Sequence, residues 1–196
     1  MTTHTKRLAI FASGGGSNAE AIIQYFSGSD LAEVALIISN KEEAYVLQRA
    51  AKHNIPAQLI SKKELRDKNT LLPLLKEHRV DMIILAGFLL LIPEYLVTAY
   101  PNSILNIHPA LLPAYGGKGM YGNHVHQAVF DNNEKASGMT IHYVDSRYDE
   151  GKIIFQAQAE LKATDTPDLI AKKVLVLEHE HYPKVIEKLL EGKLGS

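Results

Sequence analysis

Two polar side chains, Asn106 and His108, stand two positions apart at the end of an apolar run that begins at Ser103. Side chains two apart on a β-strand point to the same face, so a strand here would present a carboxamide and a titratable imidazole side by side. Such a pair can polarise a carbonyl oxygen and move a proton, which favours acyl-type chemistry. The alternative from these residues alone is a capping Asn beside a surface His, because short motifs are weak evidence by themselves.

A glycine-rich turn, residues 13–18, joins a first strand-like run to a first amphipathic segment. Glycines let the backbone approach an anion, and the N-terminus of the following helix offers free N–H groups and a partial positive charge. Ser17 and Asn18 add side-chain donors. The spacing matches neither the dinucleotide fingerprint nor the P-loop. We predict a phosphate site of another kind here; the alternative is a tight strand-to-helix turn that binds nothing.

Asp149, in the sequence Tyr148-Asp149-Glu150-Gly151, is a candidate partner for His108. A carboxylate next to an imidazole raises the pKa of the imidazole and fixes its orientation. Sequence spacing does not show whether the fold brings the two side chains together. The alternative is a turn-forming Asp before Gly.

The other histidines do not predict a metal site. His124 and His126 form one pair two positions apart, and His179 and His181 form another. Both pairs lie in segments that we predict to be helical, where residues two apart point to different faces. Zinc sites also draw on cysteine or on a matching carboxylate pattern, and this sequence has neither. We interpret His142, which alternates within a predicted strand, as structural.

Composition excludes several classes of protein. The 196 residues suffice for one domain with a sizeable core. The net charge of −1 gives no general electrostatic attraction to nucleic acid or membrane, so an anionic ligand must be held by a local site. There is no cysteine, which excludes disulfides and cysteine nucleophiles and suits a reducing cytoplasm. The polar start does not read as a signal peptide, and the longest apolar stretch, 82–93, is too short to span a bilayer.

Short apolar runs alternate with amphipathic segments in the first half of the chain, which is typical of βαβ units and a parallel sheet. Strands are predicted at residues 7–12, 33–39, 56–60, 82–86 and 104–107. Helices are predicted from Ala19 to a stop at Gly28, at 44–53 and at 62–78, where Pro73 argues for a break or for two shorter helices.

The second half changes character. Residues 109–122 hold two prolines and four glycines and are expected to form a long functional or mobile loop. A helix should follow at 123–130, then an antiparallel pair of strands at 139–144 and 152–159. A long helix should span 167–190, capped by Thr166 and kinked or divided at Pro183. The predicted fold is α/β, a doubly wound and mostly parallel sheet with an antiparallel C-terminal portion, in one domain over 1–196.

Five motifs contain these polar and glycine residues. In chain order they are Ser13-Gly14-Gly15-Gly16-Ser17-Asn18, Leu85-Ala86-Gly87-Phe88, Asn106-Ile107-His108-Pro109 with Leu111-Leu112-Pro113, Asp149-Glu150-Gly151, and Glu178-His179. Over residues 6–190 this set closely resembles the phosphoribosylglycinamide formyltransferases, the folate-dependent transformylases of purine synthesis, which have a Rossmann-like fold. The Asn-x-His-Pro and Asp-x-Gly segments resemble other folate formyltransferases as well, whereas the glycine loop points to this family.

The resemblance implies a role for each matching residue. Asn106, His108 and Asp149 would be catalytic. Gly16, Ser17 and Asn18 would hold the phosphate of the sugar substrate, and Glu178 would bond its ribose. The implied folate-binding residues are Leu89, Leu90, Leu91, Ile92, Asn106, Val144, Asp145 and Asp149.

Two departures from the family pattern stand out. The family often carries Arg where this chain has Leu90, so pterin contacts there are expected to be mainly with the backbone. The loop 116–123 is rich in glycine and differs from shorter bacterial versions. The family also places an Arg against the folate tail, for which Arg66 is a candidate, and the resemblance suggests a cis bond between Leu112 and Pro113.

The implied reaction transfers the formyl group of 10-formyltetrahydrofolate, a co-substrate, to the amine of 5′-phosphoribosylglycinamide, without a metal. The expected partners are these small molecules, not nucleic acid or membrane, and the chain is expected to be a cytoplasmic monomer or homodimer. One alternative is another folate formyltransferase or a formyl-folate hydrolase. Such relatives carry RNA-binding or regulatory domains for which we expect no room here. The other alternative is a non-catalytic sugar-phosphate-binding module.

Overall fold

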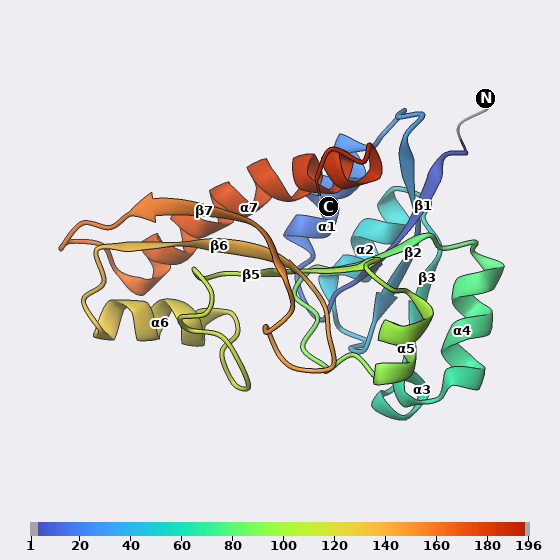
Figure 1. Cartoon of the computed structure of the whole chain (residues 1–196), viewed down its shortest axis with the longest axis horizontal. Helices are drawn as coiled ribbons and strands as arrows, with labels where there is room; N and C mark the ends of the chain where they lie inside the picture. The colour runs from blue at the N-terminus through green and yellow to red at the C-terminus, as the bar shows by residue number, and fades with distance from the viewer. Residues whose placement is uncertain (1–3, 195–196) are drawn as a thin grey trace.

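Seven strands form one sheet in the computed structural model, which describes residues 4–194 (Figure 1). Their order across the sheet is β3-β2-β1-β4-β5-β6-β7. The strands are β1 (Lys6–Phe11), β2 (Ala32–Ser39), β3 (Ala57–Leu59), β4 (Met82–Leu85), β5 (Ile104–His108), β6 (Ala136–Tyr143) and β7 (Ile153–Glu160). The pairs among β1 to β5 are parallel, and β6 and β7 are antiparallel. The predicted mostly parallel sheet with an antiparallel C-terminal portion is therefore confirmed.

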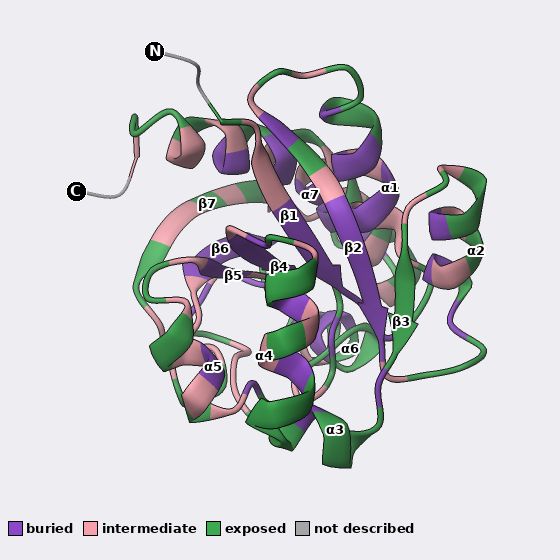
Figure 2. Cartoon of the chain, turned by 90° about the vertical axis from the view of Figure 1, so that its right-hand side faces the viewer, coloured by how far each residue is buried: buried purple, intermediate pink, exposed green. Residues whose placement is uncertain are grey.

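Helices cover both faces of this sheet, which explains why its central strands are apolar without alternation. The helices are α1 (Ser17–Tyr25), α2 (Tyr45–Lys52), α3 (Lys62–Arg66), α4 (Lys68–Glu77), α5 (Glu94–Ala99), α6 (Asn123–Asp131) and α7 (Pro167–Leu190). Leu8 and Ile10 of β1 pack in one cluster with α1, α2, α6 and α7, whereas Ala9 and Phe11 pack in a second cluster with α3, α4 and α5. In Figure 2 the strands β1 and β2 are mostly buried, and the helices turn exposed faces outward.

Residues 62–78 form two shorter helices, α3 and α4, as one of the two predicted alternatives had it, but the division does not fall at Pro73. The break in 62–78 falls at Asp67, whose carboxylate accepts from the Asn69 N–H and begins α4, while Pro73 lies inside that helix. The helix α7 runs continuously through Pro183 and is not divided there. In both helices buried neighbours hold the segment against the core, which outweighs the lost hydrogen bond. The short helix α5 was not predicted, whereas the Thr166 cap of α7 is confirmed.

The chain reverses its direction of travel across the sheet between β1 and β4. It moves from β1 outward to β2 and β3, then returns to place β4 on the other side of β1. In open α/β sheets this switch point leaves a crevice at the carboxyl ends of the strands, where ligands bind. The glycine turn after β1 and Gly87 after β4 meet there, since the Ser13 N–H donates to the Gly87 carbonyl over 3.0 Å.

A buried phenol ties α7 to the two strands beside this crevice. Tyr182 is fully buried, and its hydroxyl lies 3.0 Å from the Leu85 carbonyl and 3.3 Å from the Leu105 carbonyl. Tyr182→Phe should lower the free energy of unfolding by about 1 kcal/mol, because buried acceptors lose a donor. Urea denaturation measures this, with the exposed Tyr45→Phe as the control. Equal stability of Tyr182→Phe and the unsubstituted protein would contradict the prediction.

Candidate active site

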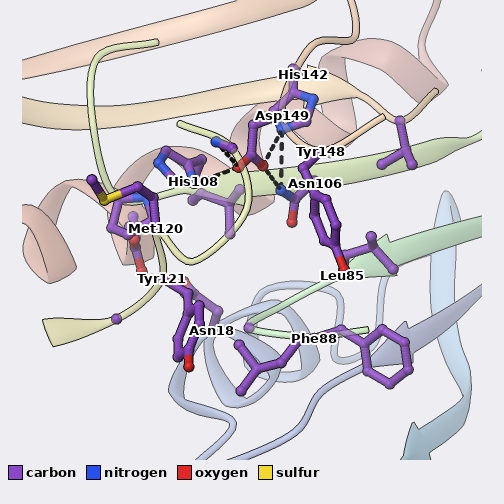
Figure 3. Close-up of a pocket in the computed structure, with 18 of the residues that line it drawn as sticks. Asn18, Leu85, Phe88, Asn106, His108, Met120, Tyr121, His142, Tyr148 and Asp149 are labelled. Atoms are coloured by element: carbon purple, nitrogen blue, oxygen red, sulfur yellow. Dashed lines mark hydrogen bonds and ion pairs between the residues drawn. The ribbon is translucent and has the colours of Figure 1, made fainter. Parts of the chain in front are cut away.

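A cavity of about 650 Å³ lies at the switch point, within the range of about 300–1,000 Å³ that small-molecule sites occupy. Its walls come from Asn18 of α1, the segment 87–92 after β4, the end of β5, the loop that precedes α6, the segment after β6, and α7. Figure 3 shows Asn106, His108, His142 and Asp149 gathered on one wall, with Asn18 and Phe88 across the cavity. Segments from the whole length of the chain therefore form one site.

His108, the last residue of β5, is held from two sides. Its Nε2 lies 2.7 Å from the backbone oxygen of Tyr115, and its Nδ1 lies 3.5 Å from Oδ2 of Asp149. Burial lowers the pKa of His108 below its ordinary value, and the Asp149 carboxylate and the Tyr115 carbonyl oppose that shift. The ring therefore holds its proton more weakly than a free imidazole does, and Asp149 is the main group that favours the protonated form.

Asp149 is the centre of the polar cluster. Its Oδ1 accepts a hydrogen bond of 3.2 Å from the Asn106 side chain, and its Oδ2 accepts one of 3.0 Å from the Gly117 N–H. Burial acts to raise the pKa of Asp149, but the nearby His142 ring, the charge of His108 and the hydrogen bond from the Gly117 N–H outweigh it, so the pKa is lowered. The structure thus brings together the two side chains whose proximity the sequence left open, His108 and Asp149.

The backbone around Asp149 explains the Asp-x-Gly spacing. Asp149 adopts a positive φ of 56°, which Asp tolerates better than most residues. A Cβ at Gly151 would lie 1.7 Å from the backbone oxygen of Tyr143, so only glycine fits beside the end of β6. The tight turn aims the carboxylate at β5.

The interpretation of His142 as structural stays a prediction, but the residue lines the cavity and contacts two of the catalytic candidates. Its Nε2 lies 3.1 Å from the Asn106 amide nitrogen and 3.6 Å from Oδ1 of Asp149. With Nδ1 bonded to the Tyr143 carbonyl, Nε2 of the neutral ring accepts from Asn106. The antiparallel register places His142 directly opposite Asn106. The sequence predicted the strand that carries His142 but not which strand it pairs with, so the contact could not be predicted. His126 of α6 is a second cavity residue that sequence reasoning did not select.

At the opposite end of the cavity, α1 meets α7. The Asn18 amide donates to Oε2 of Glu178 over 2.6 Å. Glu178 is buried, and burial raises its pKa while the bond from Asn18 opposes that shift. Gly16 caps α1 with φ 67°, and a Cβ there would lie 2.5 Å from Val46. Asn18 and Glu178 line the cavity, whereas Gly16 and Ser17 precede them without lining it.

Of the residues expected around a folate ring, most line the cavity and one does not. The four residues 89–92, together with Val144 and Asp149, line the cavity. Asp145 does not line the cavity. Its carboxylate instead bonds the backbone N–H and the guanidinium of Arg147. Arg66 is exposed at the end of α3 and lies outside the lining. The Leu112–Pro113 bond is cis, as the resemblance suggested.

Residues 4–194 contain no group of three or more His, Asp or Glu side chains arranged to hold a metal ion. Within the same residues, no helix has the length and apolar character needed to cross a membrane.

Comparison with known proteins gives one consistent result. The model of the formyl transferase family matches residues 6–186. The phosphoribosylglycinamide formyltransferase of Bacillus subtilis is 38% identical, covering 94% of this chain and 95% of that protein. The chloroplastic phosphoribosylglycinamide formyltransferase of Arabidopsis thaliana is 43% identical over 96% of this chain, which spans 67% of that protein's length. The crystal structure of phosphoribosylglycinamide formyltransferase from Bacillus halodurans superposes with a TM-score of 0.85 at 40% identity, covering 94% of this chain and 95% of that one.

Proposed function

This chain belongs to the formyl transferase family, and from that premise we propose that it transfers the formyl group of 10-formyltetrahydrofolate to the amine of 5′-phosphoribosylglycinamide. The observation that carries the proposal is the cluster in which the Asp149 carboxylate contacts both Asn106 and His108. This cluster lies on the wall of a cavity that also contains the Asn18–Glu178 pair. The products are the N-formyl sugar phosphate and tetrahydrofolate, so the reaction is a step of purine synthesis.

In the proposed mechanism, the substrate amine attacks the formyl carbon and negative charge grows on the formyl oxygen. The Asn106 amide would exchange its bond to Asp149 or to His142 for one to that oxygen, and protonated His108 would stabilise the oxygen. Collapse of the tetrahedral species breaks the bond to the folate nitrogen, which receives the proton of His108, while the amine releases one. Asp149 favours the protonated form of His108, orients the ring, and helps to return the proton to it through water.

The two ends of the cavity suit the two substrates. The N-terminus of α1, with Gly16, Ser17 and Asn18, would hold the phosphate, and the Glu178 carboxylate would accept from the ribose hydroxyls. Residues 89–92 and Val144 would enclose the pterin. Asp145 would act there only through Arg147, whose guanidinium it holds. The loop over 116–123 would close over the site and exclude water from the formyl group.

Glu178→Gln should separate stability from binding. The folded-state pKa of Glu178 is raised, so its ionisation opposes folding as the pH rises above the ordinary value for Glu. The amide removes that cost, so we expect the melting temperature at pH 7 to rise, and the difference to vanish in acid. We also expect KM for the sugar phosphate to rise about tenfold, since a charged acceptor is lost. Calorimetry and steady-state kinetics measure the two effects, and an unchanged KM would contradict the ribose assignment.

The decisive experiment supplies the protein with 10-formyltetrahydrofolate and one acceptor at a time. Phosphoribosylglycinamide should give rapid release of tetrahydrofolate. If the protein were a hydrolase, water alone would accept the formyl group. If it were a tRNA formyltransferase, initiator tRNA would be the acceptor. A non-catalytic sugar-phosphate-binding module would bind the sugar phosphate and release nothing in any arm.

We also propose that residues 1–196 form one formyltransferase domain. The single sheet supports this, since Asn106 and His108 lie on β5 and Asp149 lies in the segment that joins β6 to β7. We propose that the protein is cytoplasmic and that it is a monomer or a homodimer. The lack of cysteine suits a reducing compartment.

A further inference from the structure

The helix α2 reaches back to the glycine turn through one side chain, Arg49. Its Nε donates to the backbone oxygen of Gly15 over 2.8 Å, and its Nη1 donates to Oε2 of Glu20 over 3.0 Å. Gly15 lies just before α1, and Glu20 lies near the start of that helix. One guanidinium therefore ties the glycine turn to the helix that the turn introduces.

Glu20 is a buried carboxylate surrounded by donors. Oε1 lies 2.9 Å from both His53 Nε2 and Gln24 Nε2, and 3.5 Å from Lys52 Nζ. The hydrogen bond from His53 lowers the pKa of Glu20 most, burial opposes it, and Arg49 lowers it further, to about 2. Glu20 is therefore negatively charged throughout the neutral range.

This charge sits beside the proposed phosphate site. A carboxylate near a helix N-terminus stabilises the helix, but it also repels an anion that approaches the same N-terminus. Arg49 places a positive charge between Glu20 and the turn. By accepting from Arg49, the Gly15 carbonyl is also fixed in its direction, and carbonyl oxygens repel phosphate when they turn toward it.

Other contacts keep Arg49 and the turn in place. The guanidinium lies 5.0 Å from the centre of the Tyr45 ring, a favourable cation–π distance. The Val46 N–H donates to the Gly14 carbonyl over 3.1 Å, and the Val46 side chain fills the space where a Cβ at Gly16 would lie. Val46 and Arg49 of α2 thus contact the three glycines between them.

We propose that Arg49 is a positioning residue for the phosphate end of the sugar substrate, acting through the Gly15 carbonyl and by neutralising Glu20. This inference rests on the proposed function, because that function places the phosphate at the N-terminus of α1. Arg49 bonds the backbone of the turn and does not line the cavity. Its effect should therefore appear in the binding of phosphorylated ligands and not in the chemical step.

The test compares Arg49→Gln with Lys52→Gln. Both changes remove one positive charge from α2 next to Glu20, but only Arg49 contacts the turn, and Lys52 is 69% exposed where Arg49 is 26% exposed. Arg49→Gln should raise KM for phosphoribosylglycinamide about tenfold, while kcat and KM for the folate stay within about twofold. Lys52→Gln should change no constant by more than about twofold. Arg49→Lys should fall between, because an ammonium keeps the charge but not the fork.

A second measurement distinguishes positioning from a general loss of structure. Adding Glu20→Gln to Arg49→Gln removes the charge that was left uncompensated, so it should recover part of the lost affinity. Equal effects of Arg49→Gln and Lys52→Gln, or an equal rise in both Michaelis constants, would overturn the inference.

A third measurement is independent of formyl transfer. Calorimetry with ribose 5-phosphate and with ribose should show that Arg49→Gln weakens binding of the phosphorylated sugar alone. If the unsubstituted protein binds ribose 5-phosphate but transfers no formyl group, the proposed function fails; weaker binding by Arg49→Gln would then still support the role of Arg49 in holding a sugar phosphate. If Arg49→Gln leaves that binding unchanged, the inference fails whatever the activity.

Discussion

Replacing His108 by alanine should lower kcat for formyl transfer by a factor on the order of 10² to 10³, because the formyl oxygen loses a charged donor in the transition state. Binding of phosphoribosylglycinamide should persist, since Asn18 and Glu178 lie at the other end of the cavity. Single-turnover kinetics and calorimetry measure the two quantities separately. The prediction is large because the ring is buried and water cannot easily replace it.

Two comparisons make this result interpretable. His78→Ala removes an imidazole at the end of α4, away from the cavity, and should leave kcat unchanged. His108→Asn fills more of the vacated volume, so a low kcat in both variants points to lost chemistry and not to collapse of the site. Near-normal turnover in either His108 variant would refute the catalytic assignment.

Asp149→Asn should cause the second large loss. Burial already lowers the pKa of His108, and the Asp149 carboxylate is the main group that raises it again. Without that charge the pKa falls further, so less of the ring is protonated at pH 7. We expect kcat at pH 7 to drop on the order of 10²-fold, and the alkaline limb of the pH–rate profile to move to lower pH.

Asparagine is the suitable replacement because it tolerates the positive φ of Asp149 and keeps the same shape. Acid stability supplies the control. The folded-state pKa of Asp149 is lowered, so ionised Asp149 stabilises the protein at pH values above the ordinary pKa of Asp. This stabilisation is lost as the pH falls through the folded-state pKa. The variant should lack this dependence. A pH–rate profile that does not move would show that Asp149 does not control the proton on His108.

The sequence predicted those parts of the fold that local pattern determines. The strands and the long helix α7 follow from apolar runs and from capping residues such as Thr166. Pro73 and Pro183 misled because tertiary packing outweighs one missing hydrogen bond. The short helix α5 begins at Glu94, and Pro93 before it offers no capping side chain, so the helix left little signal in the sequence.

The same distinction between local pattern and tertiary packing applies to the residues of the site. Asn106 and His108 are neighbours on one strand, so their spacing alone indicated a shared face. The approach of Asp149 to His108 and the contact of His142 with Asn106 depend on the pairing of β5 with β6. No local rule supplies that register. The contact of Arg49 with Gly15 likewise depends on where α2 packs, which composition does not reveal.

The bond between Asn18 and Glu178 joins the first helix to the last across 160 positions. During synthesis on the ribosome, all of β1 to β7 emerges before Glu178 does, so this end of the cavity is among the last features to form. In refolding experiments the recovery of activity should therefore trail the recovery of sheet signal, and sugar-phosphate affinity should report the docking of α7. The docking of α7 therefore completes both the core and the end of the cavity that would bind the sugar phosphate.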